Sequence, residues 1–179
     1  PGRERLVLDV GGNDGFTASR LVRDANANVI VMDADAGALD VLYAGVSTNA
    51  DLAGRITPIL GDITNLSPAS GLLDAEFASY LSRVHPTALI CQAVLHHVVI
   101  TQGTPMAFAI EALARFGAPV QIEFATEDDE KVRLLLSQIP NWSGDYSTAA
   151  LLDALRARFA HVDEVGTTSA TRVVVNAWN

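Results

Sequence analysis

The chain is predicted to fold as an α/β domain with a doubly wound, mostly parallel seven-stranded sheet and a reversed last strand. Short apolar segments typical of buried strands alternate along the chain with segments whose apolar residues have helical spacing. Hydrophobic residues make up 49% of the 179 residues, as expected for a sheet covered on both faces. The last two strand-like segments are joined by a short link, which indicates an antiparallel pair.

Each predicted element follows from a local pattern. Strands are expected where short apolar runs occur, at 6–10, 28–35, 55–63, 87–95, 119–125, 161–166 and 171–178. Helices are expected at 15–25, 36–48, 103–117 and 147–159. Thr104 can cap the third helix, and Ser147 or Thr148 can cap the fourth. Pro58 places the third strand near one edge of the sheet, because proline cannot donate a ladder hydrogen bond.

Two segments, 64–86 and 126–146, lack strong periodicity and are long for connections inside a compact domain, so they are candidate functional loops. The second begins with the acidic run "TEDDEK", which is typical of a solvated helix start and is also able to bind a cation. It ends with Trp142 and Tyr146, whose rings could cover an apolar substrate or pack over the edge of the sheet.

Bulk composition excludes several classes of protein. The formal net charge is −9, and the twelve basic residues are scattered, which argues against nucleic-acid partners and anionic membranes. No apolar run reaches the length of a membrane span. The single cysteine, Cys91, rules out an intramolecular disulfide and indicates a reducing, cytoplasmic location. No metal site is expected, since adjacent histidines chelate poorly and His85 and His161 lie elsewhere in the chain.

Polar residues follow the strands at the edge where parallel sheets bind ligands. The first strand leads into the turn Gly11-Gly12-Asn13-Asp14-Gly15, which lacks the spacing of a dinucleotide-binding turn and the lysine of a P-loop. The ligand is therefore expected to carry no phosphates. Asp33 can bind the two hydroxyls of a ribose, and Asp62 can accept a hydrogen bond from an exocyclic amine. Together these residues indicate a nucleoside with a cationic or amino-acid tail.

At this point four stretches, in order, resemble the motifs of the class I S-adenosylmethionine-dependent methyltransferases, a Rossmann-like family. "VLDVGGNDG" is similar to the first motif, an acidic residue followed by x-G-x-G-x-G, with Asn13 where the middle glycine is common. "VIVMDAD" resembles the second motif, "LGDI" the third and "ALICQAVLHHV" the fourth, and "LHH" is frequent in small-molecule methyltransferases. The resemblance covers essentially the whole chain, including the reversed last strand.

The resemblance implies which residues contact S-adenosyl-L-methionine. The glycine turn would approach the methionine part, the acid before it would steer the ammonium group, the acid of the second motif would bind the ribose, the third motif would frame the adenine and the fourth would line the pocket near the methyl group. The turn contributes Gly11, Gly12, Asn13 and Gly15, and the acid before it is Asp9. The second motif contributes Asp33 and Ala34, the third Asp62 and Ile63, and the fourth Gln92 and Ala93. For the acids, capping and turn formation are the alternative explanation.

His96 and His97 are the candidate catalytic residues, because an imidazole can take a proton from an acceptor hydroxyl near neutral pH. Adjacent residues point in different directions, so at most one is expected to face the substrate, and His97 is preferred. The alternative is that one histidine is packed and hydrogen-bonded while the other is solvated.

The expected function is methyl transfer to a small-molecule acceptor at oxygen by one domain, residues 1–179. The first motif starts so early, at Leu6, that no room remains for the N-terminal helices that close over the cofactor in the family. Other domains of a longer chain are therefore possible partners. One alternative is a non-catalytic cofactor-binding or scaffolding module of a larger protein. Another is a nicotinamide-dependent reductase with an unusual glycine turn.

Overall fold

The structure, a computed structural model, describes residues 5–166 and 169–179. Its strands are β1 (Leu6–Val10), β2 (Asn28–Asp33), β3 (Ile56–Leu60), β4 (Ala88–Gln92), β5 (Val120–Ala125), β6 (His161–Val165) and β7 (Arg172–Trp178). They form a seven-stranded sheet in the order β3-β2-β1-β4-β5-β7-β6. The sheet is mostly parallel, so the predicted α/β fold class is confirmed.

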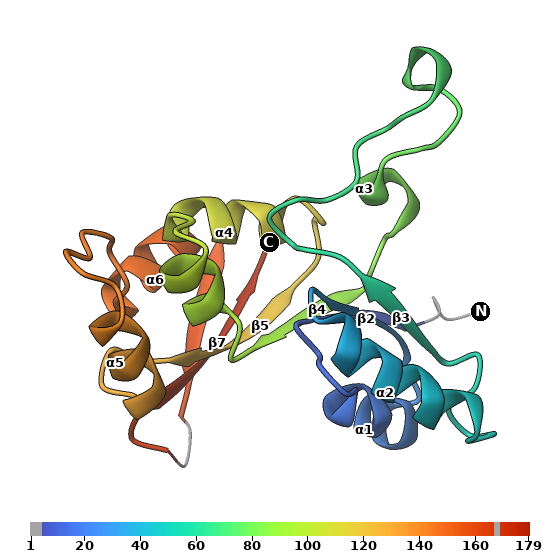
Figure 1. The fold of residues 1–179 in the computed structure, drawn as a ribbon, viewed down its shortest axis with the longest axis horizontal. Helices are drawn as coiled ribbons and strands as arrows, with labels where there is room; N and C mark the ends of the chain where they lie inside the picture. The colour runs from blue at the N-terminus through green and yellow to red at the C-terminus, as the bar shows by residue number, and fades with distance from the viewer. Residues whose placement is uncertain (1–4, 167–168) are drawn as a thin grey trace. The chain divides into compact units, whose positions relative to one another are not determined.

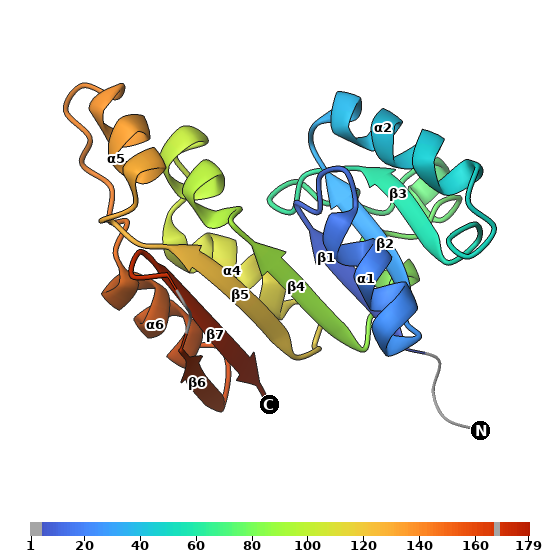
Figure 2. The same cartoon turned by 90° about the horizontal axis from the view of Figure 1, so that it is seen from below.

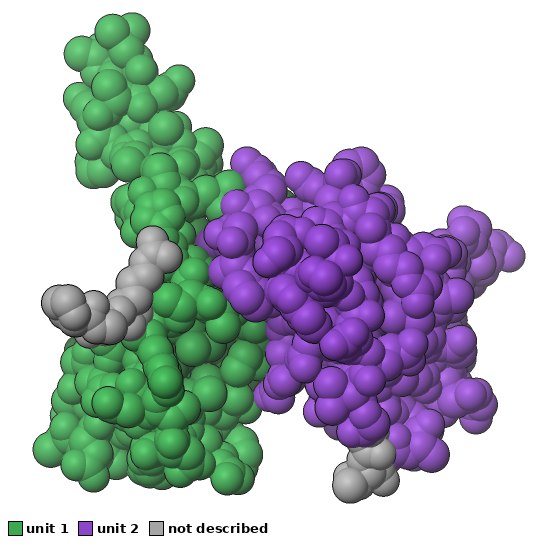
Figure 3. Space-filling model, turned by 180° about the vertical axis from the view of Figure 1, so that it is seen from behind, with its two compact units in different colours: residues 1–90 green, residues 91–179 purple. Residues whose placement is uncertain are grey.

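The helices are mostly short. They are α1 (Phe16–Ala25), α2 (Ala36–Ser47), α3 (Tyr80–Arg83), α4 (Met106–Ala114), α5 (Glu130–Ser137) and α6 (Thr148–Arg156), with a 3₁₀ turn η1 (Leu72–Asp74) and a π-helical turn η2 (His97–Thr101). The chain divides into two compact units, residues 1–90 and residues 91–179 (Figure 3). We describe each unit by itself.

In the first unit, β1, β2 and β3 run parallel, with Leu8 opposite Ile30 and Ile30 opposite Thr57. Helices α1 and α2 pack on this sheet through one apolar cluster, which contains Val22 of α1 and Leu42 of α2. The alternate residues of the strands supply the other side of that cluster. β3 is an edge strand, as Pro58 predicts.

In the second unit, β7 runs antiparallel to both β5 and β6, with Val175 opposite Ile122 on one side and Glu164 on the other. This confirms the reversed strand. The link predicted between β6 and β7, residues 167–170, lies partly outside the described residues. Helices α4 and α6 lie side by side in this unit (Figures 1 and 2).

The helix starts test the capping predictions. Ser147 caps α6, with its hydroxyl oxygen accepting the Ala150 amide at 3.1 Å. The prediction for Thr104 was wrong: Pro105 occupies the position before α4, and no side chain caps that helix. Because Pro105 has no backbone N–H, one of the four amides that lack a partner at a helix start is absent here.

The two segments without strong periodicity are partly helical. The acidic run ends as the helix start of α5, where the Asp129 carboxylate accepts the Lys131 amide at 3.0 Å. The segment after β3 contains η1 and α3, but residues 71–78 are all exposed and stand away from the rest of the first unit (Figures 1 and 3). Ser70 and Phe77 pair in an antiparallel bridge at the base of this projecting segment.

Candidate functional site

The glycine turn that follows β1 is held by backbone hydrogen bonds and contains three residues with positive φ, Gly11, Asn13 and Gly15. The Gly11 amide donates to the Met32 carbonyl at 2.7 Å, and the Gly15 amide donates to the Gly12 carbonyl at 2.9 Å. Asn13 has φ 49°, a left-handed conformation that asparagine adopts more readily than most residues. This explains how asparagine can occupy the place of the middle glycine of the motif.

Gly12 and Gly15 have no space for a side chain. A Cβ atom on Gly12 would lie 2.7 Å from Asp9 Oδ2 and 2.9 Å from Val31 Cγ1. At Gly15, which has φ 78°, a Cβ would lie 2.3 Å from Leu42 Cδ1. The turn is therefore packed directly over the end of β1 and against α2, so its backbone alone forms the surface there.

Asp9 is a buried carboxylate beneath this turn. Its side chain is 1% exposed, and its Oδ2 atom has no hydrogen-bond partner. Burial and the nearby charge of Asp33 raise the pKa of Asp9 to about 6. A buried polar atom without a partner is costly, so its retention at this position calls for a functional explanation.

Asp33, at the end of β2, ties the glycine turn to α2. Its Oδ2 accepts the Asn13 amide and its Oδ1 accepts the Asp35 amide, both at 2.9 Å. The backbone carbonyl of Asp33 accepts the Gly61 amide, so the ends of β1, β2 and β3 are joined at this residue. Asp35 then caps α2, with its Oδ1 atom accepting the amides of Gly37 and Ala38.

Asp62 follows β3 and organises its own turn. Its Oδ1 accepts the Thr64 amide at 2.8 Å and the Thr64 hydroxyl at 2.7 Å. Its neighbour Ile63 is buried, while Ala34 after β2 is exposed. The structure thus groups the glycine turn, Asp9 and Asp33, and connects Asp62 to them through the Gly61 bond.

In the second unit, the end of β4 contains a strained backbone position. Ala93 has φ 53°, which alanine rarely adopts, and its amide donates to the Glu123 carbonyl at 3.0 Å. Such outliers cluster at functional sites. The π-helical turn η2, a rare form that also recurs at functional sites, follows directly and begins at His97. Gln92, just before Ala93, is half-buried.

The two histidines have different surroundings. Their rings lie 4.1 Å apart between centroids, but His96 is buried while His97 is exposed. Burial, followed by the electrostatic effect of the neighbouring His97 and of Arg172, lowers the pKa of His96 to about 4, so His96 is neutral at pH 7. Its Nδ1 atom is buried without a hydrogen-bond partner, which departs from the expected packed and hydrogen-bonded histidine.

A three-residue ion cluster beside α5 was not predicted. The Arg172 guanidinium, at the start of β7, contacts Glu123 at 3.0 Å and the helix cap Asp129 at 3.1 Å. The sequence placed the acids at a strand end and a helix start, but pairing over more than forty residues leaves no local signal.

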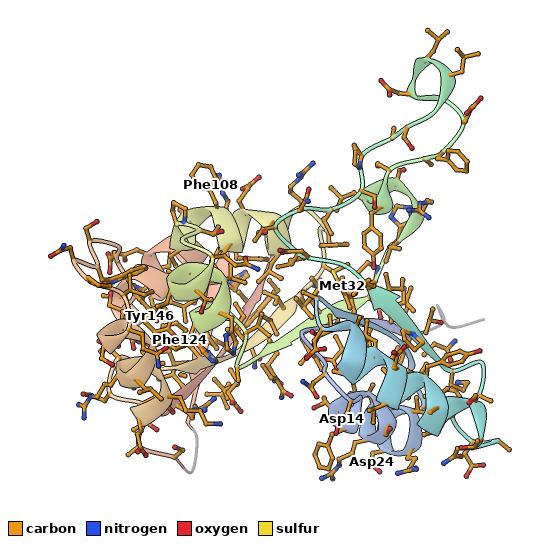
Figure 4. The ribbon with its side chains drawn as sticks, in the orientation of Figure 1. Asp14, Asp24, Met32, Phe108, Phe124 and Tyr146 are labelled. Atoms are coloured by element: carbon orange, nitrogen blue, oxygen red, sulfur yellow. The ribbon has the colours of Figure 1, made fainter. Side chains whose placement is uncertain are left out.

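Tyr146 packs on Phe124 with ring centroids 4.7 Å apart (Figure 4), so Tyr146 is a core residue and not part of a cover over a substrate.

The described residues contain no group of three or more histidine, cysteine, aspartate or glutamate side chains that could hold a metal ion. None of the helices in the described part of the chain has the length and apolar character that crossing a bilayer requires.

Comparison with known proteins gives a fold and one sequence relative. No protein-family model matches the chain. The nodulation protein NoeA of Rhizobium meliloti (strain 1021) is 27% identical over 153 residues, which cover 86% of this chain and 32% of NoeA. The chain therefore spans about a third of the length of this relative.

Solved structures of methyltransferases superpose on nearly the whole chain. Monomeric WbdD, described elsewhere as a bifunctional kinase-methyltransferase, matches with TM-score 0.69 and 19% identity over 99% of this chain and 37% of its own. Magnesium protoporphyrin IX methyltransferase from Synechocystis, solved with bound S-adenosylhomocysteine, matches with TM-score 0.62 and 16% identity. This match covers 98% of the present chain and 75% of the Synechocystis chain. The O-methyltransferase NcsB1 matches with TM-score 0.60 and 18% identity, over 97% of the present chain and 48% of NcsB1. The chain thus has the fold of the class I S-adenosylmethionine-dependent methyltransferases.

Proposed function

We propose that residues 1–179 form a methyltransferase domain that binds S-adenosyl-L-methionine and transfers its methyl group to an oxygen of a small-molecule acceptor. The observation that carries this proposal is the buried, unpartnered Asp9 oxygen beneath the glycine turn. An ammonium group bound at the turn would supply both the missing hydrogen bond and a compensating charge. In the methyltransferase fold, the amino acid part of the cofactor provides such a group.

The other residues of the first unit fit the remaining parts of this cofactor. Packing at Gly12 and Gly15 leaves backbone only, so a ligand can approach the turn closely. Asp33 uses each carboxylate oxygen for one amide, and a carboxylate has about four acceptor sites, so it can still accept ribose hydroxyls. Asp62 is a carboxylate at the end of β3, and a carboxylate has about four acceptor sites, while Ile63 offers an apolar neighbour for the adenine.

The acceptor side of the proposal rests on the second unit. When bound, the cofactor supplies a methyl group on a positively charged sulfur, which is a good electrophile. The chain's own work is then to align the acceptor and to remove its proton. We assign the base to His97, because its ring is exposed, whereas His96 is buried and its pKa lies far below neutral. Gln92 and Ala93 are proposed to line the pocket near the methyl group.

Two neighbours support this choice of cofactor and acceptor. NcsB1 was solved in complex with S-adenosylmethionine and a hydroxy-methyl naphthoic acid, and the Synechocystis enzyme with S-adenosylhomocysteine. A non-catalytic cofactor-binding module of a larger protein is the second candidate. It is favoured by the fact that the chain corresponds to about a third of NoeA and of WbdD.

The test is calorimetric titration with S-adenosylmethionine and S-adenosylhomocysteine, with NADH as a control ligand. Both adenosyl ligands are expected to bind and NADH is not. Asp9→Asn keeps the shape but removes the charge, so it should abolish measurable binding of both. Asp40→Asn, at an exposed position of α2, is the matched control and should bind as the wild type does. A folded wild-type protein that binds neither ligand would overturn the proposal.

Catalysis is tested separately. The formation of S-adenosylhomocysteine is followed with a panel of phenols and hydroxy acids as acceptors, for the wild type, His97→Ala and His96→Ala. Loss of turnover in His97→Ala of about 100-fold or more is expected for a general base. Cofactor binding with no turnover on any acceptor would favour the non-catalytic candidate.

A further inference from the structure

A cavity opens between helices α4 and α6 of the second unit. Its volume is about 520 Å³. Ala107 of α4 forms part of one wall, and Ala150, Ala154 and Ala157 of α6 form the other. None of the residues predicted to bind the cofactor, and neither histidine, lines it. The cavity is therefore a feature that the proposed function does not use.

The sequence of α6 explains why space remains here. Leu151 and Leu155 occupy the buried face of the helix and are fully enclosed in the core. The adjoining face carries Ala150, Ala154 and Ala157, which are spaced so as to line up along the helix. The two leucines anchor α6 in the core, and the small alanine side chains on the adjoining face leave space beside the helix.

Among the residues that the structure describes, the charged groups that line this cavity are two carboxylates. Asp145 lies in the loop before α6, and Asp153 lies on α6 itself. Asp145 accepts a hydrogen bond from the Ser147 hydroxyl at 2.9 Å, which holds its carboxylate in place. Asp153 contacts Arg156 at 3.7 Å, a long and exposed pair that leaves most of its acceptor capacity open. No lysine or arginine of residues 5–166 and 169–179 lines the cavity.

We propose that this cavity binds an organic cation with an apolar body, of which a primary alkylammonium is the simplest form. Ligand clefts of roughly 300–1,000 Å³ with mostly apolar walls and a few polar groups are typical of small-molecule sites. The alanine walls and Met106 suit an alkyl chain or a ring, and the two carboxylates attract the positive end. The same charges repel phosphorylated and carboxylated ligands and so weaken their binding.

The proposal predicts different affinities for three probes of equal chain length: n-octylammonium, octanol and octanoate. Each is titrated into the chain of residues 1–179 at pH 7.5, while NMR follows the amides of Gly103 and Gly144 and the methyl group of Met106. Octylammonium is expected to bind about three- to ten-fold more tightly than octanol, the range for two exposed charge pairs, and octanoate more weakly than either. Equal binding of all three probes would overturn the assignment to cations.

Two filling variants test the location. Ala154→Leu and Ala107→Leu extend into the cavity from opposite walls, and each should abolish octylammonium binding. Ala149→Leu, at an exposed position of α6 that does not line the cavity, is the matched control. Thermal unfolding checks that each variant is folded, and having two filling variants covers the case in which one of them is not. Undiminished binding in a folded filling variant would place the ligand elsewhere and refute the proposal.

The charge variants complete the test. Asp145→Asn and Asp153→Asn should each reduce the preference for octylammonium over octanol, while Asp163→Asn on β6 should leave it unchanged. Because these readings do not involve S-adenosylmethionine, they stand or fall independently of the methyltransferase proposal. If the preference for octylammonium over octanol persisted when both carboxylates were removed, the proposed cation site would be contradicted.

Discussion

At the scale of single residues, the candidate site holds several groups that make the folded state less stable than it could be. Asp9 and His96 each bury a polar atom without a partner. Asn13 and Ala93 are non-glycine residues in the left-handed region. Such features cost stability and persist where function requires them. Within each unit, their occurrence near a strand end, that of β1 in the first unit and that of β4 in the second, is an argument for a functional role that does not depend on motif similarity.

Gly12→Ala tests the packing of the glycine turn. The new methyl group would collide with the buried Asp9 carboxylate and with Val31. We expect the free energy of unfolding to fall by about 1–3 kcal/mol, the usual cost of overpacking, and cofactor binding to be lost. Urea unfolding and calorimetry measure the two effects.

The matched control for this substitution is Gly45→Ala in α2, where a Cβ meets nothing within 4 Å. Here the protein should become more stable by up to about 1 kcal/mol, because alanine favours the helix. If Gly12→Ala proved as harmless as Gly45→Ala, close packing at the turn would not be the reason for glycine there.

At the scale of elements, Arg172 joins the start of β7 to the first turn of α5. Burial by itself raises the pKa of Asp129. The Lys131 amide and the Arg172 guanidinium outweigh this effect and keep the pKa of Asp129 below its usual value. Asp129 is therefore ionised in the folded protein and depends on this arginine. Because β7 lies next to β5, one side chain fixes the position of a helix relative to two strands.

Arg172→Met should therefore loosen α5. Removing the cation leaves Asp129 and Glu123 without their partner, and we expect a loss of about 2–4 kcal/mol in the free energy of unfolding. The exposed pair Arg133–Asp128 offers the control, since Arg133→Met should cost less than about 1 kcal/mol. Hydrogen exchange of the α5 amides, faster in the first variant only, is the measurement. Equal exchange in both variants would show that the cluster does not hold the helix.

The projecting segment behaves differently from the other elements. Leu72, Leu73 and Phe77 are 73%, 90% and 66% exposed, so folding removes little of their apolar surface from water. Changing all three residues to serine should alter the melting temperature of the chain by less than about 2 °C. A larger decrease would mean that the segment packs against the body of the first unit in solution.

At the scale of the whole molecule, the sequence was sufficient to predict the seven strands and the helices α1, α2, α4 and α6 in chain order, because each strand is a short apolar run and these helices have periodic apolar residues. It did not predict α3 and α5, which lie in the two segments without strong periodicity. Pro58 even located an edge strand. The Arg172 cluster and the cavity between α4 and α6 could not be predicted, because both depend on contacts between residues that are distant in the sequence. The roles of the site residues, His97 above all, remain predictions.

Asp9 and His96 make opposite contributions to the pH dependence of stability. The pKa of Asp9 rises from 3.8 to about 6 on folding, so the folded state binds the extra proton and stability falls as pH rises through this window. The pKa of His96 falls from 6.5 to about 4, so the unfolded state binds the extra proton and stability rises over nearly the same window. Between pH 4 and 6 the two effects largely cancel.

Single substitutions should reveal each contribution. We expect the stability of Asp9→Asn relative to wild type to increase by about 2–3 kcal/mol between pH 4 and 6.5, because the cost of ionising a buried carboxylate is gone. His96→Gln should show the reverse, with its relative stability decreasing by about 2–3 kcal/mol over the same range. Urea unfolding followed by circular dichroism at each pH gives both differences. A difference that stays constant with pH would mean that the group has the same pKa in the folded and unfolded states, and burial would then not control its charge.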